Sequence, residues 1–421
     1  MTSPINNLSR LRQSLQIPAQ WCVILIGLSV PISVAFDNLM MGLILLVALF
    51  NFGSIARIAV SHPVARAAVL LFSALLVAML YGTTPLKEAF TTLMKYVDLA
   101  FIPIFIFLLS DESVRIKARR AFITAMAVTL LLSYLVGLKI LPLLSWMNKF
   151  TEPANPAIFH SHITQNNMMA FAIFLAMLEF RDAVSKSMRG TWGSFILLAL
   201  GNMLFMVQGR TGYFILLALI GWFLWTSLSR HMRRRNMKWG LTQQSFLLVI
   251  ILAMAFVAYH VSSRLHDRIA LVVTEYQAWI PDHGKDTSTG QRLDFYSNTL
   301  RIVQEHITLG VGTGGFPAAF ERQVAGKDVM PTHNPHNEYL MISVQTGIVG
   351  FALLLFLFYT HWRCAPLLPT PFEQDAARGL LIAYMINCML NSALMDHSDG
   401  LFFAFMTAVL FSNFKTGARH G

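Results

Sequence analysis

Apolar stretches of nearly membrane-spanning length recur along almost the whole of this 421-residue chain. A helix that crosses the hydrocarbon core of a bilayer needs about 20 mostly apolar residues. The composition agrees with this pattern, because 55% of the residues are hydrophobic and only 13% are charged, whereas soluble domains carry about 25% charged residues. The sequence therefore predicts an all-α polytopic membrane protein.

We expect about twelve transmembrane helices. The predicted spans are residues 20–36, 38–55, 67–82, 90–110, 121–138, 163–180, 192–209, 212–229, 245–262, 347–362, 379–396 and 400–414.

The basic residues indicate the orientation of these spans. Twenty of the 32 Lys and Arg residues fall in segments that lie on one side of the membrane if both termini are cytoplasmic, as the positive-inside rule requires. The net charge of +11 then reflects topology and contact with anionic membrane lipid, and it does not point to nucleic acid. We expect transmembrane helices 1–9 in residues 1–262, one large outer helical loop in 263–346, and helices 10–12 in 347–421.

The outer loop carries one candidate anion ligand, Arg292. Apolar side chains recur at the spacing of an amphipathic helix at Leu293, Tyr296, Leu300, Val303 and Ile307. Residues 288–290 are N-cap candidates, so Arg292 is expected in the first turn, where a guanidinium and free N–H groups together can hold an anion.

A second part of the loop carries the candidate base, His336. Asn334 is a good N-cap and Pro335 suits the first helical position, which would place His336 and Asn337 in a first turn that runs into Tyr339. The positive end of the helix dipole disfavours imidazolium, so His336 is expected to be neutral and able to accept a proton. A lone loop histidine often has no such role, and His333 is an alternative, but the helix-cap argument favours His336.

Two further charges lie at or within predicted spans. Arg210, in the short outer connection that begins at Gln208, runs against the charge bias; it is either a snorkelling arginine or a ligand of an anion. Lys95 lies three residues before Asp98 inside the fourth span, which indicates either an ion pair on one helix face or a functional intramembrane charge.

Other motifs carry weaker signals. Residues 310–316 match a GxGxxG pattern, but no strand precedes them, so a tight glycine turn is the better interpretation. His160 and His162 have no acidic partner at a metal-ligand spacing, and their role stays open. The sequence predicts no metal site and no cofactor.

Arg210, Arg292 and His336 are all predicted at the outer membrane surface. Two arginines and a neutral histidine suit an anionic, lipid-linked substrate that is attacked by an alcohol. The arginines would hold a pyrophosphate as it leaves, and the histidine would take the proton of the attacking hydroxyl.

Several segments in a fixed order also carry a family resemblance. They are Gly209-Arg210-Thr211-Gly212, Thr289-Gly290-Gln291-Arg292-Leu293, Gly310-Val311-Gly312-Thr313-Gly314-Gly315-Phe316, His336-Asn337-Glu338-Tyr339-Leu340 and Gln345-Thr346-Gly347-Ile348-Val349-Gly350. Because these motifs occur in this order, the chain resembles the O-antigen ligase and polymerase superfamily of bacterial inner-membrane glycosyltransferases.

The resemblance implies transfer of an O-antigen glycan from undecaprenyl pyrophosphate to the lipid A–core oligosaccharide, in the inner membrane and on its periplasmic face. It implies that His336 is the base and that Arg210 and Arg292 bind the donor pyrophosphate. Apart from the resemblance, Lys95, Gln208, Asn337 and Tyr339 are candidate secondary residues of the site. The intact His336-Asn337 pair and the single large loop favour a ligase over a polymerase. The alternatives are that polymerase, a protein O-oligosaccharyltransferase of the same superfamily and, in a different class, a lipid or anion transporter.

Overall fold

The computed structural model describes residues 4–237, 240–284 and 286–414. Within these ranges the regular structure is helical, apart from one isolated β-bridge between Glu152 and Asn155. The predicted all-α class is therefore confirmed. The chain divides into two compact units. The first unit comprises Met1–Ala125, Trp279–Thr370 and Cys388–Gly421, and the second comprises Met126–Ala278 and Pro371–Asn387.

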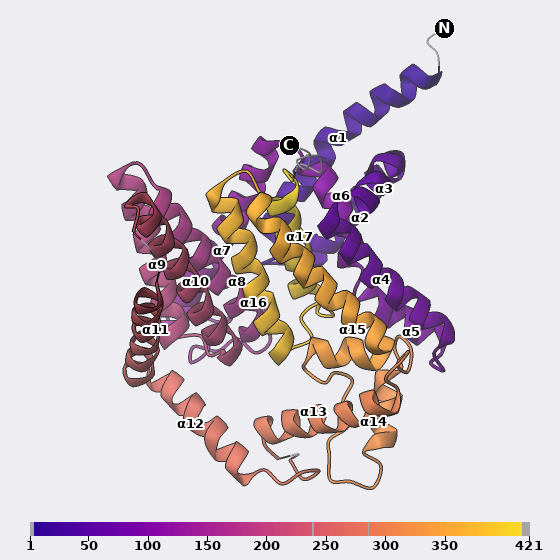
Figure 1. Ribbon diagram of the computed structural model, residues 1–421, viewed down its shortest axis with the longest axis vertical. Helices are drawn as coiled ribbons and strands as arrows, with labels where there is room; N and C mark the ends of the chain where they lie inside the picture. Colours follow the sequence, from indigo (N-terminus) through magenta and orange to yellow (C-terminus); the bar gives the residue numbers. More distant parts are fainter. Residues whose placement is uncertain (1–3, 238–239, 285, 415–421) are drawn as a thin grey trace. The chain divides into compact units, whose positions relative to one another are not determined.

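The helices of the first unit come from three parts of the chain (Figure 1). They are α1 (Pro4–Ser29), α2 (Val34–Phe50), α3 (Phe52–Ser61), α4 (Pro63–Tyr81), α5 (Leu86–Met94), α6 (Asp98–Leu108), α13 (Ser288–Glu305), α14 (Phe316–Gln323), α15 (Glu338–Cys364), the 3-10 helix η1 (Ala365–Leu367) and α17 (His397–Phe411).

The second unit is built mainly from the middle of the chain. Its helices are α8 (His162–Asp182), α9 (Lys186–Phe205), α10 (Arg210–Arg234), α11 (Leu241–Val261) and α12 (Ser263–Ala278). The boundaries between the units fall within α7 (Glu112–Gly137), between α12 and α13, and at the start of α16 (Pro371–Leu390) and near its end.

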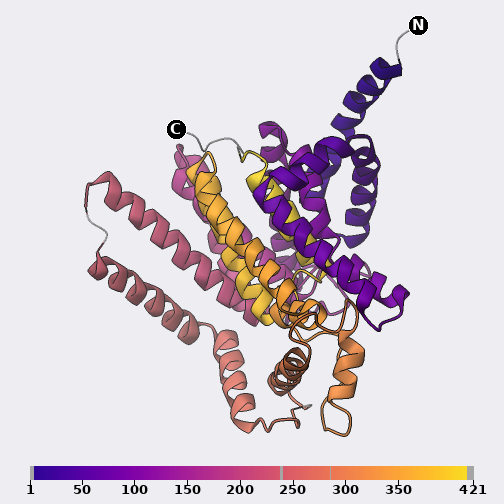
Figure 2. The same ribbon diagram turned by 45° about the vertical axis from the view of Figure 1, so that its right-hand side comes forward.

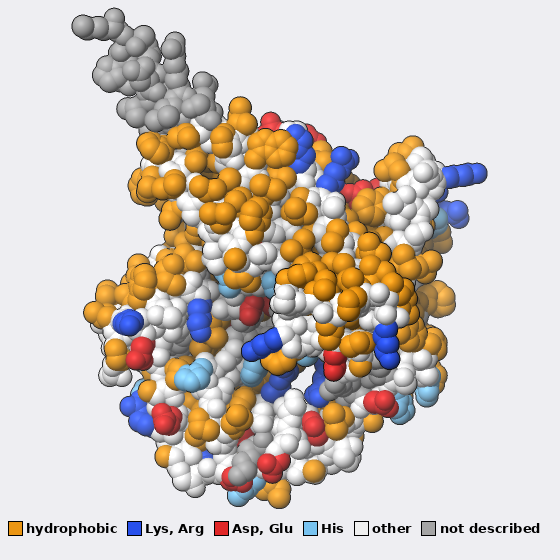
Figure 3. All heavy atoms as spheres, turned by 180° about the vertical axis from the view of Figure 1, so that it is seen from behind, with side chains coloured by type: hydrophobic (Ala, Val, Ile, Leu, Met, Phe, Trp, Pro, Cys, Tyr) orange, Lys and Arg blue, Asp and Glu red, His pale blue; other side chains and the backbone are white. Residues whose placement is uncertain are grey.

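Many of these helices suit a membrane. Six of the described segments are long and apolar enough to cross one, and the bent pair α2 and α3, with an angle of 97° between them, would be a seventh. Large apolar side chains are exposed over much of the helical surface, as Figure 3 shows from one side, and a bilayer would cover such side chains. The chain is therefore a multi-pass membrane protein. Each of the twelve predicted spans overlaps a described helix, but the number twelve stays a prediction.

In the first unit, α15 packs against α4, and α17 packs against α6. Helices α13 and α14 pack against each other and against α15 (Figure 2). These contacts bring α13 and α14, which belong to the predicted outer loop, onto α15.

The predicted glycine turn is present between α13 and α14. Gly310, Gly312 and Gly314 all have positive φ, at 70°, 87° and 82°, which residues with a side chain rarely adopt. A Cβ atom on Gly312 would lie 2.3 Å from the Cα atom of Gly82. Glycine at this position therefore allows the loop to touch the end of α4.

Helix α15 is interrupted at Gly347, where φ is 63° and ψ is −155°. Across this break the rings of Tyr339 and Phe358 have centroids only 6.2 Å apart, although nineteen residues of straight helix would separate them by about 28 Å. The N-terminal part of α15 therefore folds back on the rest, and it presents its first residues to α13.

Candidate functional site

His336 lies immediately before α15, and not inside its first turn. The N-cap of α15 is Asn337, whose side-chain oxygen accepts a hydrogen bond from Leu340 N at 3.0 Å. The prediction that Asn334 caps this helix is wrong, because the Asn334 side chain has other partners. Its Oδ1 accepts hydrogen bonds from His336 N at 2.8 Å and from Ser392 Oγ at 2.7 Å.

The backbone of His336 is in the left-handed region, with φ at 54°. Such a conformation is uncommon for a residue other than glycine and persists only where its surroundings hold it. Two neighbours on α13 do so here. The Tyr296 hydroxyl donates to His336 O at 3.1 Å, and the Phe295 ring stacks on the imidazole with centroids 6.2 Å apart and 21° between the planes.

The environment of His336 favours its neutral form. Burial of the half-buried ring, followed by the positive charge of Arg292, lowers the pKa of His336 from 6.5 to about 4. The expected neutral imidazole is thus found, but its cause is burial and a nearby guanidinium instead of a helix N-terminus. Among the described residues, neither ring nitrogen forms a hydrogen bond, so both are available to a substrate.

Arg292 lies just beyond the first turn of α13, in which it was expected. The N-cap is Thr287, whose hydroxyl accepts from Gly290 N at 3.0 Å. Arg292 is therefore the fifth residue of the helix, and its backbone N–H is not one of the free groups at the N-terminus. Arg292 is partly exposed and close enough to His336 to affect its pKa. The structure thus brings these two predicted residues together.

The buried face of α13 is mixed and differs in part from the predicted apolar face. Leu300 is 48% exposed, and Ile307 lies beyond the end of the helix, whereas Phe295 and Asp294 are buried. The reason is that the Asp294 carboxylate accepts hydrogen bonds from Trp279 Nε1 at 2.9 Å, from Asp282 N at 3.0 Å and from Gly284 N at 2.7 Å. Burial of a carboxylate with three donors fixes the segment before α13 to that helix.

Arg210 lies in the second unit, as the first residue of α10. Gly209 and Gly212 let this end of α10 approach α8 closely, since a Cβ atom on either would lie within 2.5 Å of the side chain of Asn166. Gln208 N donates to Asn155 Oδ1 at 2.9 Å. The glycine spacing around Arg210 therefore has a packing reason in this structure.

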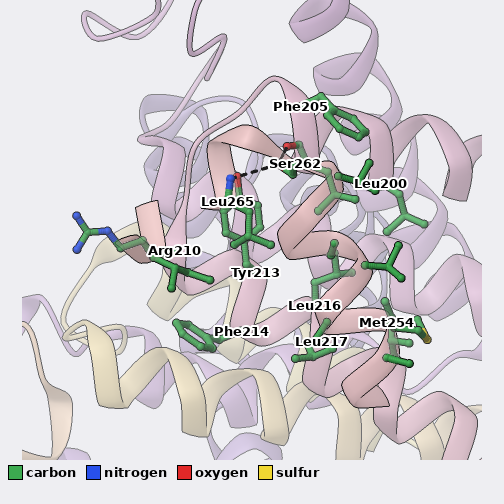
Figure 4. A pocket seen from close by; sticks show the side chains of 18 of the residues that line it. Leu200, Phe205, Arg210, Tyr213, Phe214, Leu216, Leu217, Met254, Ser262 and Leu265 are labelled. Carbon is green, nitrogen blue, oxygen red and sulfur yellow. Dashed lines mark hydrogen bonds between the residues drawn. The ribbon is translucent and has the colours of Figure 1, made fainter. Parts of the chain in front are cut away.

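The aliphatic part of Arg210 lies at an apolar pocket of about 880 Å³. Helices α9, α10, α11 and α12 line it, and its lining includes Leu204, Tyr213 and Met254. Figure 4 shows the Arg210 guanidinium directed away from the apolar side chains. A cation at the edge of an apolar pocket is the arrangement that an amphiphile with an anionic head requires.

The structure also places the predicted secondary residues and the remaining histidines singled out in the sequence. Asn337 caps α15 and donates through Nδ2 to Met389 O at 3.0 Å. Tyr339 packs on Phe358, and His333 is exposed in the loop. His160 is buried, and His162 is the first residue of α8.

Lys95 does not form the predicted ion pair with Asp98. The helix is interrupted between them, so Lys95 ends α5 and is exposed, whereas Asp98 begins α6 and is 1% exposed. The Asp98 carboxyl instead lies 3.9 Å from His397 Nδ1.

One part of this site was missed from the sequence. The end of α16 and the turn after it, residues 389–395, contact the His336 loop through Met389, Ser392 and Leu394. The sequence holds a signal, since Asn391 and Ser392 are adjacent polar residues inside the predicted span 379–396. Within the described residues, no group of three or more His, Cys, Asp or Glu side chains is arranged to hold a metal ion.

A comparison with known families identifies the middle of the chain. Residues 195–355 match the family model described as O-antigen ligase. This segment is therefore similar to the O-antigen ligase family. The matched segment contains Arg210, Arg292 and His336, and the predicted resemblance is confirmed.

The chain is also similar to a curated protein whose description names no function. A protein of Haemophilus influenzae (strain Rd) that is described as an uncharacterized protein is 24% identical over 206 residues. The alignment covers 47% of this chain and 50% of the relative, so the chain spans about half the length of the curated protein it matches.

Proposed function

We propose that this chain is an O-antigen ligase, which transfers a glycan from undecaprenyl pyrophosphate to the lipid A–core oligosaccharide at the periplasmic face of the bacterial inner membrane. The observation that carries the proposal is His336, a neutral imidazole with both nitrogens available, beside the positive charge of Arg292. A neutral base next to a cation suits the attack of an alcohol on a carbon that carries an anionic leaving group.

In the proposed step, an acceptor hydroxyl oxygen attacks the anomeric carbon of the donor sugar. The new C–O bond forms as the bond from that carbon to the pyrophosphate oxygen breaks. His336 takes the hydroxyl proton, and Arg292 stabilises the charge that develops on the leaving undecaprenyl pyrophosphate. Among the residues that the structure describes, no Asp or Glu is an evident glycosyl nucleophile, so we propose a single displacement that inverts the anomeric centre.

We propose that Arg210 binds a phosphate of the lipid-linked donor and that the apolar pocket beside it holds part of the polyprenyl chain. The pocket lining and the direction of the guanidinium support this assignment.

The reaction is proposed to need no metal, with arginines supplying the positive charge. Activity that EDTA abolishes and magnesium restores would contradict this part of the proposal.

The test is transfer by the purified protein in detergent, with purified donor lipid and core acceptor. We expect a lipid A–core product with inverted configuration. A polymerase would instead extend donor-linked glycan, and a protein O-oligosaccharyltransferase would need a protein acceptor. A transporter would make no product in detergent, where no gradient exists.

His336→Ala is the first variant to compare. A general base contributes about 10² to 10⁴ in rate, so we expect a loss of that size while the protein still folds. His333→Ala is the matched control, because His333 is exposed in the same loop, and its effect should be small. An inactive His333→Ala protein beside an active His336→Ala protein would overturn the assignment.

A further inference from the structure

The 389–395 segment is joined to the His336 loop by several hydrogen bonds within the first unit. Asn337 Nδ2 donates to Met389 O at 3.0 Å, and Ser392 Oγ donates to Asn334 Oδ1 at 2.7 Å. These residues are more than fifty positions apart in the chain. The contacts therefore arise from the tertiary structure, and the local sequence of the loop does not predict them.

Ser392 acts on His336 through one intermediate side chain. Asn334 Oδ1 accepts from Ser392 Oγ and, at 2.8 Å, from His336 N. The Asn334 amide is thus fixed between a buried hydroxyl, 3% exposed in Ser392 as a whole, and the backbone of the candidate base. Without the hydroxyl, the Asn334 side chain would have lost one of the two groups that set its orientation.

Glu338 holds the other side of the loop. Its side chain is fully buried, and its Oε2 accepts from Leu394 N at 2.7 Å and from Met395 N at 3.3 Å. Its Oε1 accepts from the Tyr96 hydroxyl at 2.9 Å. A buried carboxyl with three donors ties the start of α15 to the 389–395 segment.

These bonds bear on the unusual backbone of His336. Its φ of 54° is unfavourable for histidine and persists only where the surroundings fix the residues on both sides. Asn334 fixes the N–H of His336, and Asn337 and Glu338 fix the chain that follows it. A backbone held this way aims the imidazole without using either ring nitrogen.

We propose that the 389–395 segment is part of the functional site and that Ser392 and Glu338 are positioning residues, which hold His336 in its left-handed conformation. This inference rests on the proposed function, because positioning matters only if His336 takes part in the transfer. It assigns a role to the connection between α16 and α17, far in sequence from the histidine.

The first experiment is a double-mutant cycle with Ser392→Ala and Asn334→Ala in the transfer assay. Loss of a hydrogen bond between neutral groups should lower kcat about three- to tenfold, while KM for the donor stays unchanged. Because Ser392 acts through Asn334, we expect no further loss from Ser392→Ala in an Asn334→Ala background. Ser297→Ala is the control, since this half-buried serine of α13 donates only to Asp294 O.

The second experiment does not need activity. Hydrogen–deuterium exchange of residues 334–338 should become faster in Ser392→Ala and in Glu338→Gln, and it should stay unchanged in Ser297→Ala. Wild-type kcat in Ser392→Ala, or fully additive losses in the cycle, would overturn the inference and leave the proposed function intact. If the wild-type protein transferred no glycan, the proposed function would fail. Unchanged exchange at 334–338 would then refute the positioning role independently.

Discussion

The protonation of His336 yields a pH prediction. Its folded-state pKa of about 4 lies below the usual 6.5, because burial and the charge of Arg292 both disfavour imidazolium. A lowered pKa means that the neutral base is fully present at neutral pH and is lost only as pH falls through about 4. We expect kcat/KM, which reports the free enzyme, to be flat from about pH 6 to 8 and to fall in acid.

Arg292→Gln tests the cause of that shift. Removing the guanidinium charge should move the acid midpoint upward, toward the ordinary histidine pKa, although burial still holds it below 6.5. The pH profile of the residual activity is the measurement. A wild-type midpoint near 6.5 would contradict the lowered pKa of His336, and a midpoint that does not move in Arg292→Gln would show that Arg292 does not contribute to the shift.

Arg292 also carries a prediction about rate. If its guanidinium stabilises the leaving pyrophosphate, Arg292→Ala should cost about 3 kcal/mol or more, roughly a hundredfold in kcat. Arg292→Lys should recover little, because an ammonium lacks the two-pronged geometry that matches phosphate oxygens. Arg322→Ala on α14 is the control, since Arg322 is an exposed arginine of the same loop. Equal losses in the two alanine variants would refute a specific role.

The two asparagines of the loop show what local sequence can and cannot determine. Asn334 followed by Pro335 is a good capping signal, yet the cap is Asn337. Asn334 is instead engaged by Ser392, which is fifty-eight residues away. The identity of His336 as the candidate residue was predictable from its motif. Its left-handed backbone was not, because that backbone depends on tertiary hydrogen bonds.

Among the helices, α13 was predicted as an element but with a buried face that differs in part from the observed one. The periodic apolar position Leu300 is exposed, because Asp294 and Asn298 share the buried face with Phe295 and Ile302. Apolar periodicity predicts the buried face only where the interior is apolar. Here the donors to Asp294 come from a preceding loop whose path the sequence did not indicate.

Helix α15 provides a stability prediction at its break. Gly347 combines a φ of 63° with a tight contact, since an added Cβ would lie 2.2 Å from Thr308 O. Gly347→Ala should therefore cost roughly 3 kcal/mol or more. Gly326→Ala is a matched control, because Gly326 has a φ of 78° with nothing within 4 Å of the added atom, and strain alone costs about 1 to 2 kcal/mol.

The measurement is the melting temperature of each glycine variant in the same detergent. We expect Gly347→Ala to melt well below Gly326→Ala, and Gly326→Ala slightly below the wild type. Similar melting temperatures for the two variants would show that α15 does not need to fold back at Gly347.

For the chain as a whole, the twelve-span topology depends most on α8 and α9. Each is long enough to cross, with 21 and 20 residues, about 30 Å of helix. Neither is among the six segments that qualify by apolar composition. In α8 the first two turns contain the polar residues Gln165, Asn166 and Asn167. Those polar residues are buried, so they need not face lipid, and a criterion based on hydropathy alone would miss a span of this kind.

Cysteine labelling tests whether α8 and α9 both cross the membrane. The informative position is Val184, which is 95% exposed between the two helices. If both helices cross, a cysteine at 184 is cytoplasmic, whereas cysteines at exposed Phe150 and Asp286 are periplasmic. Cys22, Cys364 and Cys388 would first be replaced by alanine. A membrane-impermeant reagent added to intact spheroplasts should then label positions 150 and 286, but position 184 only after permeabilisation. Labelling at 184 from outside would place it on the same side as 150, and the count of twelve spans would be wrong.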